Sequence, residues 1–339
     1  MSLKTTSSHG AALSRSGSPG LAGEVAVPGS VANLGGGFDA LGVAVQLYLK
    51  ARITDIKEDG GTRLVVTRSM PPVPGRNALE TAFETLARRT GLRTPTVFVE
   101  VTSDIPMAAG LGSSAAATVA GLRIFERVTA PVPDGVLLAA ATAVEGHADN
   151  AAPALFGGLN SVVEIEGSDP VAMRWSWPDE LRLVVATPAV GLATAKARAA
   201  LPEQMPRGDA IYNLQRVLCL VHALQHREYG RLREAVKDRW HQPARASLVP
   251  LLAEALKLED PDVLGAFLSG AGPSIAFVVR TDAQHEQEGR QGVPPGSVAR
   301  VERMVSSMYE RAGVAATVRT LGVHEGELVE TRNAVKAFR

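Results

Sequence analysis

Segment 105–117 (Ile-Pro-Met-Ala-Ala-Gly-Leu-Gly-Ser-Ser-Ala-Ala-Ala) has the composition of a loop that could bind phosphate. Gly110 and Gly112 can adopt positive φ angles and let a ligand approach the backbone closely. Ser113 and Ser114 then begin an alanine-rich helix, whose first N–H groups have no partner inside the helix. Free amides at the positive end of a helix dipole form an anion site.

This segment differs from the Walker phosphate loop, which ends in Gly-Lys-Ser or Gly-Lys-Thr. No lysine occurs between Lys57 and Lys196. Phosphate charge must therefore be met by amides, a metal ion and arginines from other segments. A second interpretation is a serine that caps a helix after a glycine-rich turn, which is common in α/β proteins. The segment alone leaves both interpretations open.

Short β-branched runs alternate with longer helical patterns along the chain, which predicts a mixture of strands and helices. Strands are predicted at 25–27, 43–53, 64–67, 96–102, 161–165, 182–187, 265–268, 274–279 and 315–320. Helices are predicted at 78–90, 113–128, 135–144, 194–201, 211–226, 229–239, 248–256 and 297–312. The mixture indicates two α+β domains rather than a regular doubly wound sheet.

Segment 166–180 is polar and rich in turn residues, and we place the domain boundary there. The prediction is a disordered tail at 1–23, an N-terminal domain at 24–168 and a C-terminal domain at 169–339. One apolar stripe on the helix at 211–226 is expected to pack in the core. It consists of Leu214, Val217, Leu218, Val221 and Leu224.

The composition limits the partners. Lys plus Arg and Asp plus Glu number 35 each, so no net charge attracts nucleic acid or anionic membrane. No apolar run approaches the roughly 20 residues that span a bilayer. The single cysteine, Cys219, excludes an intramolecular disulfide and is expected to be buried and inert, which favours a reducing, cytoplasmic location. The oligomeric state is not determined, and a homodimer is compatible with the sequence.

Three segments in order resemble the signatures of the GHMP kinases, a family named for galactokinase, homoserine kinase, mevalonate kinase and phosphomevalonate kinase. The first is Val27-Pro-Gly-Ser-Val-Ala-Asn-Leu-Gly-Gly-Gly-Phe-Asp-Ala-Leu-Gly42. The second is the glycine-rich segment 105–117, and the third is Leu268-Ser-Gly-Ala-Gly-Pro-Ser-Ile275. The resemblance covers about residues 25–325. It implies a two-domain GHMP kinase fold, with an N-terminal domain like domain 2 of ribosomal protein S5 and a ferredoxin-like C-terminal domain.

Three further segments resemble the homoserine kinases within that family. They are Glu145-Gly-His-Ala-Asp-Asn-Ala-Ala-Pro-Ala-Leu-Phe-Gly-Gly158, Thr194-Ala-Lys-Ala-Arg198 and His241-Gln-Pro-Ala-Arg245. The resemblance implies ATP-dependent phosphorylation of L-homoserine to O-phospho-L-homoserine, a step of threonine biosynthesis. Homoserine is a zwitterion, so its site needs oxygens for the ammonium and a guanidinium for the carboxylate.

The resemblance also implies a role for each site residue. ATP would bind at Pro106, Met107, Ala108, Ala109, Gly110, Leu111, Gly112, Ser113, Ser114 and Ala115. Within this set Gly110–Ser114 would wrap the phosphates, and Asn77 would lie near the adenine. Mg²⁺ would bind Ser114 and Glu145, since a hard ion suits hydroxyl and carboxylate oxygens. Homoserine would lie among Asn33, Asp39, His147, Asp149, Asn150, Thr194, Arg198 and Arg245. Catalysis would depend on Ser114, Glu145 and Asp149.

Several alternatives stay open at this point. Asp149 could act as a general base or only bind the substrate ammonium. Asn33 and Asp39 could be turn residues, His147 could orient its neighbours, and Arg198 and Arg245 could form surface ion pairs. Ala244 replaces a tyrosine of the homoserine kinase pattern, which could enlarge the pocket for another small alcohol or acid. A ligand sensor without activity is a further alternative, although Ser114, Glu145 and Asp149 are intact.

Overall fold

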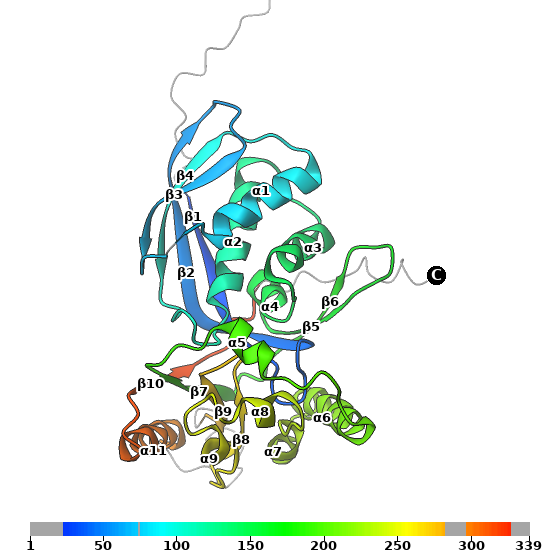
Figure 1. Ribbon diagram of the computed structural model, residues 1–339, viewed down its shortest axis with the longest axis vertical. Coiled ribbons are helices and arrows are strands. Elements are labelled where there is room, and N and C mark those ends of the chain that lie inside the picture. The colour runs from blue at the N-terminus through cyan, green and yellow to red at the C-terminus, as the bar shows by residue number, and fades with distance from the viewer. Residues whose placement is uncertain (1–22, 74, 282–295, 327–339) are drawn as a thin grey trace, which may run out of the picture.

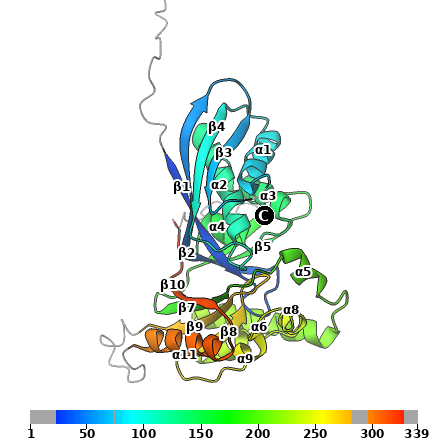
Figure 2. The same cartoon turned by 60° about the vertical axis from the view of Figure 1, so that its left-hand side comes forward.

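The computed structural model describes residues 23–73, 75–281 and 296–326; the tail expected at 1–23 lies, apart from Gly23, outside these residues. Two sheets, each accompanied by helices, follow one another along the long axis of the molecule (Figures 1 and 2). The predicted α+β class is therefore confirmed. Within the described ranges, no helix has the length and apolar character needed to cross a membrane.

The first sheet has the strand order β3-β4-β2-β5-β6, and β1 pairs with β2 beside this path. Its strands are β1 (Glu24–Ala32), β2 (Leu41–Lys57), β3 (Arg63–Met70), β4 (Thr96–Ser103), β5 (Leu159–Val163) and β6 (Val171–Trp175). In β2, odd-numbered residues from 45 to 53 are buried and even-numbered ones are exposed or half-buried. One face of this sheet therefore meets the core and the other meets solvent.

The buried face is covered by α1 (Ala78–Thr90), α2 (Ser113–Val128), α3 (Asp134–Glu145) and α4 (Ala151–Phe156) (Figure 1). Helix α1 has the predicted bounds because both ends carry capping residues. The Asn77 side chain accepts a hydrogen bond from the Leu79 N–H, and the Glu80 side chain accepts one from the Asn77 N–H. Gly91, at φ 69°, ends the helix in the left-handed conformation.

The second sheet has the order β10-β7-β9-β8 and is antiparallel throughout. Its strands are β7 (Leu181–Pro188), β8 (Val263–Leu268), β9 (Ile275–Arg280) and β10 (Ala316–Leu321). The helical elements are α5 (Thr194–Ala199), α6 (Arg207–Gln225), η1 (Tyr229–Arg231), α7 (Leu232–Ala235), α8 (His241–Arg245), α9 (Leu252–Leu256) and α11 (Ser297–Arg311). Val184 on one face packs with Val301 of α11, whereas Val185 on the other face joins the core of the first sheet. The face of the second sheet that carries Val185 therefore packs against the part of the molecule that contains the first sheet.

Residues 322–325 form a strap that returns from the second sheet to the first. The Gln46 N–H donates to Gly322 O, and the His324 N–H donates to Ala44 O. Val323 forms an isolated antiparallel bridge with Val45 of β2. The two sheets are therefore joined by backbone hydrogen bonds as well as by apolar packing.

The sequence-based prediction was wrong in several places. Segment 166–180 contains β6, which pairs with β5, so the first sheet continues to Trp175; the domain limits at 168/169 stay a prediction. The short helices α4 and α8 were not predicted. On α6, Leu214 and Leu218 are 65% and 72% exposed, because helical periodicity does not say which face meets the core. Cys219 is half-buried rather than buried.

Candidate active site

The glycine-rich loop before α2 has the geometry of an anion site. Helix α2 begins at Ser113, after Gly112 at φ 70°, and no side chain of the described residues caps its first N–H groups. A Cβ on Gly110 would lie 2.3 Å from Ser269 O, and one on Gly112 would lie 2.2 Å from Ser30 Oγ. Both glycines are thus required by close approach as well as by positive φ. The unsatisfied amides at this helix end are free to bind phosphate oxygens.

The carbonyl oxygens of this loop are held by the other two signature segments. Ser274 N donates to Ala109 O at 3.2 Å, and the Ser269 hydroxyl donates to Gly110 O at 2.6 Å. Ser30 N donates to Leu111 O at 3.1 Å. Three consecutive carbonyl oxygens are therefore bound within the protein, which fixes the loop for a ligand that needs N–H donors.

A cavity of about 130 Å³ opens in front of this loop and collects nearly all the residues predicted from the sequence. Its lining includes Asn33, Asp39, Pro106, Ala108, Ala109, Gly110, Leu111, Gly112, Ser113, Ser114, Ala115, Glu145, His147, Asp149, Asn150, Thr194, Arg198 and Arg245. Met107 and Asn77 are not part of it. They line a neighbouring cavity of about 310 Å³, together with Leu49, Val73 and Ala117. Ala244 lines neither cavity.

Ser114 and Glu145 meet at the edge of the front cavity. The Ser114 hydroxyl donates to Glu145 Oε1 at 2.9 Å, and the Thr118 hydroxyl donates to the same oxygen at 2.5 Å. Thr118 was not predicted, although it lies one helical turn after Ser114. No group of three or more His, Cys, Asp or Glu side chains suited to a metal occurs in the described residues. Ser114 and Glu145 could therefore supply two protein ligands to one metal ion. Phosphate and water oxygens would have to complete its coordination shell.

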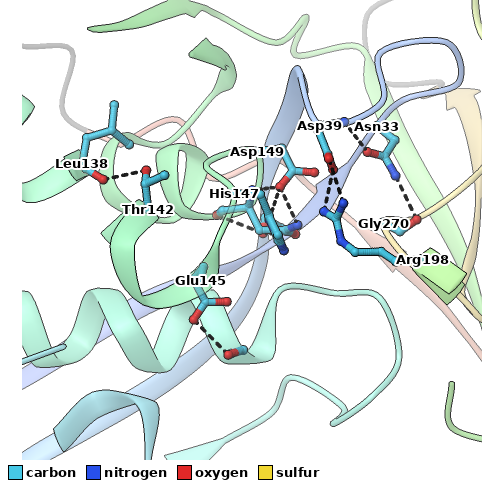
Figure 3. A network of polar contacts seen from close by, with 12 residues as sticks. Asn33, Asp39, Leu138, Thr142, Glu145, His147, Asp149, Arg198 and Gly270 are labelled. Carbon is cyan, nitrogen blue, oxygen red and sulfur yellow. Dashed lines mark hydrogen bonds and ion pairs between the residues drawn. The ribbon is translucent and has the colours of Figure 1, made fainter. Parts of the chain in front are cut away.

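Asp149 lies at the centre of the polar network in Figure 3 and is 5% exposed. Its Oδ1 is 2.6 Å from His147 Nδ1 and accepts from the Asn150 N–H at 2.9 Å. The hydrogen bond to Asp149 raises the pKa of His147, although burial opposes it. The Asn150 side chain is itself held by the Ser30 hydroxyl. Asp149 Oδ2 has no protein partner among the described residues and remains for a ligand.

Asp39 and Arg198 form a two-bond ion pair across the cavity, with distances of 2.8 and 2.9 Å (Figure 3). This pair raises the pKa of the Arg198 guanidinium. Asp39 itself is positioned by Asn33, whose Oδ1 accepts from the Asp39 N–H and whose Nδ2 donates to Gly270 O. Both polar groups of Asn33 are thus occupied within the protein, so its contribution here is to hold Asp39.

Arg245 is 2% exposed, so it is not a surface ion pair. Its Nε donates to Ala197 O at 3.1 Å and its Nη1 donates to Gly270 O at 3.0 Å. Burial lowers the pKa of this guanidinium. Its Nη2 has no hydrogen-bond partner among the described residues. Arg245 therefore joins α5 and the third signature segment while one donor group remains for a ligand in the cavity.

Phe38 lines the cavity and was not predicted as a site residue. Its ring centroid lies 5.5 Å from Cζ of Arg198 and 5.3 Å from Cζ of Arg245. The ring is also 4.6 Å from that of Trp240, edge to face. The sequence could have indicated this role, because Phe38 lies between the glycines and Asp39 of the first signature. Phe38 supplies one aromatic surface for both guanidinium groups.

Comparison with known proteins agrees with this geometry. Residues 77–158 match the GHMP kinases N terminal domain and residues 220–292 match the GHMP kinases C terminal domain. The chain is 39% identical over 258 residues to a homoserine kinase of Thermus thermophilus, covering 75% of this chain and 86% of that protein. It is also 39% identical over 259 residues to a homoserine kinase of Solibacter usitatus, covering 74% and 82%.

Solved structures give the same result. The crystal structure of homoserine kinase from Cytophaga hutchinsonii superposes with a TM-score of 0.77 at 25% identity, covering 91% of this chain and 97% of that one. Mevalonate kinase of L. major, at 18% identity and a TM-score of 0.61, covers 89% and 96% and shares the fold. The chain therefore belongs to the GHMP kinase family, and its sequence places it among the homoserine kinases of that family.

Proposed function

We propose that the protein transfers the γ-phosphoryl group of ATP to the hydroxyl of L-homoserine, as an enzyme of threonine biosynthesis. The observation that carries the proposal is the front cavity, which joins the unsatisfied amides of α2 to three acids and two arginines. The amides suit the phosphates, and the mixed charges suit a zwitterion. The relatives named homoserine kinases support this substrate.

The two ligands would occupy opposite ends of the site. The nucleoside would lie in the cavity lined by Leu49, Asn77 and Met107, with its phosphates at Gly110–Ser114. The homoserine carboxylate would contact Arg198 and the free donor of Arg245. Its ammonium would contact Asp39 or Oδ2 of Asp149. This orientation directs the side-chain hydroxyl toward the γ-phosphate.

In the reaction, a bond forms between the homoserine hydroxyl oxygen and the γ-phosphorus while the bond from that phosphorus to the β–γ bridging oxygen breaks. ADP leaves, and the hydroxyl proton departs to Asp149 or to water. A loose transition state requires alignment and charge neutralisation more than early deprotonation. The loop amides supply fixed donors for the developing charge.

Mg²⁺ is part of the proposal, with Ser114 and Glu145 as its protein ligands and with phosphate and water as the others. When bound, it would neutralise charge on the transferred phosphoryl group. A homodimer and a cytoplasmic location stay predictions from the sequence. The exposed Leu214 and Leu218 on α6 make that helix the first surface to test for self-association.

The deciding experiment measures ADP release with homoserine, serine, mevalonate or pantoate as the acceptor. We expect turnover with homoserine far above the others and a phosphomonoester signal of O-phosphohomoserine by phosphorus NMR. Brisk turnover of another acceptor, with none for homoserine, would overturn the substrate assignment. ATP binding without turnover of any acceptor would indicate a ligand sensor instead.

A further inference from the structure

The glycine-rich loop also lines a second cavity, of about 250 Å³, whose lining includes none of the acceptor residues. Residues of β7 and β10 form one wall, and Leu47 with the loop residues Pro106–Ala109 and Leu111 form the other. We call this space the rear cavity. It is a space between one face of the second sheet and the first domain, where the side chains of the two do not pack fully against each other.

The floor of the rear cavity follows from strand register. Thr317 pairs with Thr187 and Arg319 pairs with Val185, so these four side chains lie together on one face of the sheet. The opposite face packs on α11, as Val184 and Val301 show. Because β10 is an edge strand, the rear cavity is open beside Thr317 and Arg319, which are both exposed.

The glycine-rich loop borders both cavities. Pro106, Ala108, Ala109 and Leu111 line both the front and the rear cavity. Ala108 has a φ of 51°, unusual for a residue with a Cβ, and its carbonyl oxygen accepts from the Leu192 N–H at 3.0 Å. An occupant of the rear cavity would therefore contact the same residues that border the phosphate site.

The rear cavity has the chemistry of a site for a small anion with an apolar body. Arg319 has no carboxylate partner among the described residues; its one hydrogen bond there is a long one, 3.4 Å, to the carbonyl oxygen of Asp104. Val185 and Leu321 provide buried apolar surface. None of the described residues that line it is acidic, which disfavours a ligand with an ammonium group.

We propose that the rear cavity is an effector site for a small aliphatic carboxylate. The carboxylate binds the guanidinium of Arg319, within reach of the Thr317 hydroxyl, and the alkyl part packs on Val185 and Leu321. Its occupancy changes the affinity of the loop for nucleotide, because the loop forms the shared wall. Only this second statement depends on the proposed function; binding in the rear cavity does not.

The test uses 3-methylbutanoate as the probe and the full chain as the protein. Saturation-transfer NMR of the probe methyl groups measures binding without any assay of activity. We expect saturable binding with a dissociation constant of about 1 mM, as befits so small a ligand. Arg319→Met should weaken it about tenfold or more, by loss of a charge-assisted bond. Arg303→Met, on an exposed position of α11, is the matched control and should change nothing.

Thr317→Phe fills the rear cavity from the edge strand and should abolish probe binding while turnover persists. A saturating probe should change the dissociation constant of a non-hydrolysable ATP analogue about fivefold, the low end for coupled sites. Absence of saturable binding, equal binding by Arg319→Met, or displacement of the probe by homoserine would each overturn the site. Binding without an effect on nucleotide affinity would overturn its role as an effector site.

Discussion

The two ends of the front cavity are built in different ways. The part of the phosphate end that contacts anions is made of backbone: Gly110, Gly112 and the first amides of α2, with the carbonyl oxygens bound by neighbouring segments. Only the proposed metal ligands there, Ser114 and Glu145, are side chains. The acceptor end is made of side chains, and two pairs of them are already in contact, Asp39 with Arg198 and His147 with Asp149. A backbone site binds any nucleoside triphosphate, whereas an end built from charged side chains can be changed by point mutation. Nucleotide binding and acceptor choice should therefore respond to different substitutions.

The largest effect should come from the metal ligand at the phosphate end. Glu145→Gln keeps an acceptor for Ser114 and Thr118 but removes the charge, and kcat should fall about 1000-fold, or about 4 kcal/mol. Steady-state kinetics at several Mg²⁺ concentrations measures this. Glu310→Gln, on an exposed position of α11, is the control and should leave kcat unchanged. Near-normal kcat at low Mg²⁺ in Glu145→Gln would show that this carboxylate does not hold the metal.

The second-largest effect should come from a change in the backbone geometry at the phosphate end. In Gly110→Ala the new Cβ would clash with Ser269 O, so the loop would have to move away. Because a shift of this kind misplaces the phosphates, kcat/KM for ATP should fall about 100-fold. Gly91→Ala has a similar positive φ but no atom of the described residues within 4 Å of the new Cβ, so it introduces strain without a clash. If both variants lose the same activity, strain alone explains the loss and the close approach is unimportant.

At the acceptor end, Arg198→Lys keeps the charge and loses the planar fork. Homoserine affinity should fall about ten- to 150-fold, the loss of a charge-assisted bond, while ATP affinity stays the same. The wild-type enzyme should discriminate strongly against 3-aminopropanol, which lacks the carboxylate, and the variant much less. Arg239→Lys, a surface arginine paired with Asp209, is the control. An unchanged preference ratio would show that Arg198 does not bind the carboxylate.

The aromatic surface under the two guanidinium groups should have a smaller effect. Phe38→Leu removes contacts worth about 1 kcal/mol and should raise KM for homoserine about fivefold, with KM for ATP unchanged. Phe38→Tyr should restore it. Phe98→Leu, which removes a similar contact with Lys57 far from the cavity, should not change either KM. If KM for homoserine and KM for ATP change equally, Phe38 stabilises the whole fold rather than the acceptor site.

The smallest effect concerns stability and pH. The bond to Asp149 raises the pKa of His147 above its ordinary value near 6.5, so the contribution of this pair is complete below that value. It disappears as the pH rises through the folded-state pKa. His147→Gln should therefore lower the free energy of unfolding more at pH 6 than at pH 8, as urea unfolding can show. In an Asp149→Asn background this pH dependence should vanish; its persistence would assign it to another group.

Sequence reasoning succeeded where the information was local. Helices α1 and α2 have the predicted bounds because Asn77, Gly91 and Gly112 act on the residues beside them. Strand β6 was missed because it is short, half-exposed and flanked by polar turn residues. Its pairing with β5, which the sequence does not show, stabilises it. The exposed face of α6 could not be distinguished from a core face by period alone.

The site shows the same limit. The residues in the signature segments converge on the front cavity, but their pairings do not follow from spacing. Asp39 meets Arg198, and Arg245 meets Gly270, only because α5, α8 and the first and third signatures fold together. The double contact of Phe38 and the complete burial of Arg245 depend on the same approach. Where a residue's role depends on contacts with segments far away in the sequence, the role can be assigned only once the fold is known.

The strap at 322–325 has a consequence for biosynthesis of the chain. During translation, β1–β6 and α1–α4 all leave the ribosome long before Gly322, Val323 and His324 do. Until then the N–H of Gln46 and the carbonyl of Ala44 lack the partners that they have in the finished protein. The first domain therefore waits for a segment that is translated only after β10, and an emerging chain exposes that part of β2 to chaperones or to its neighbours on the polysome.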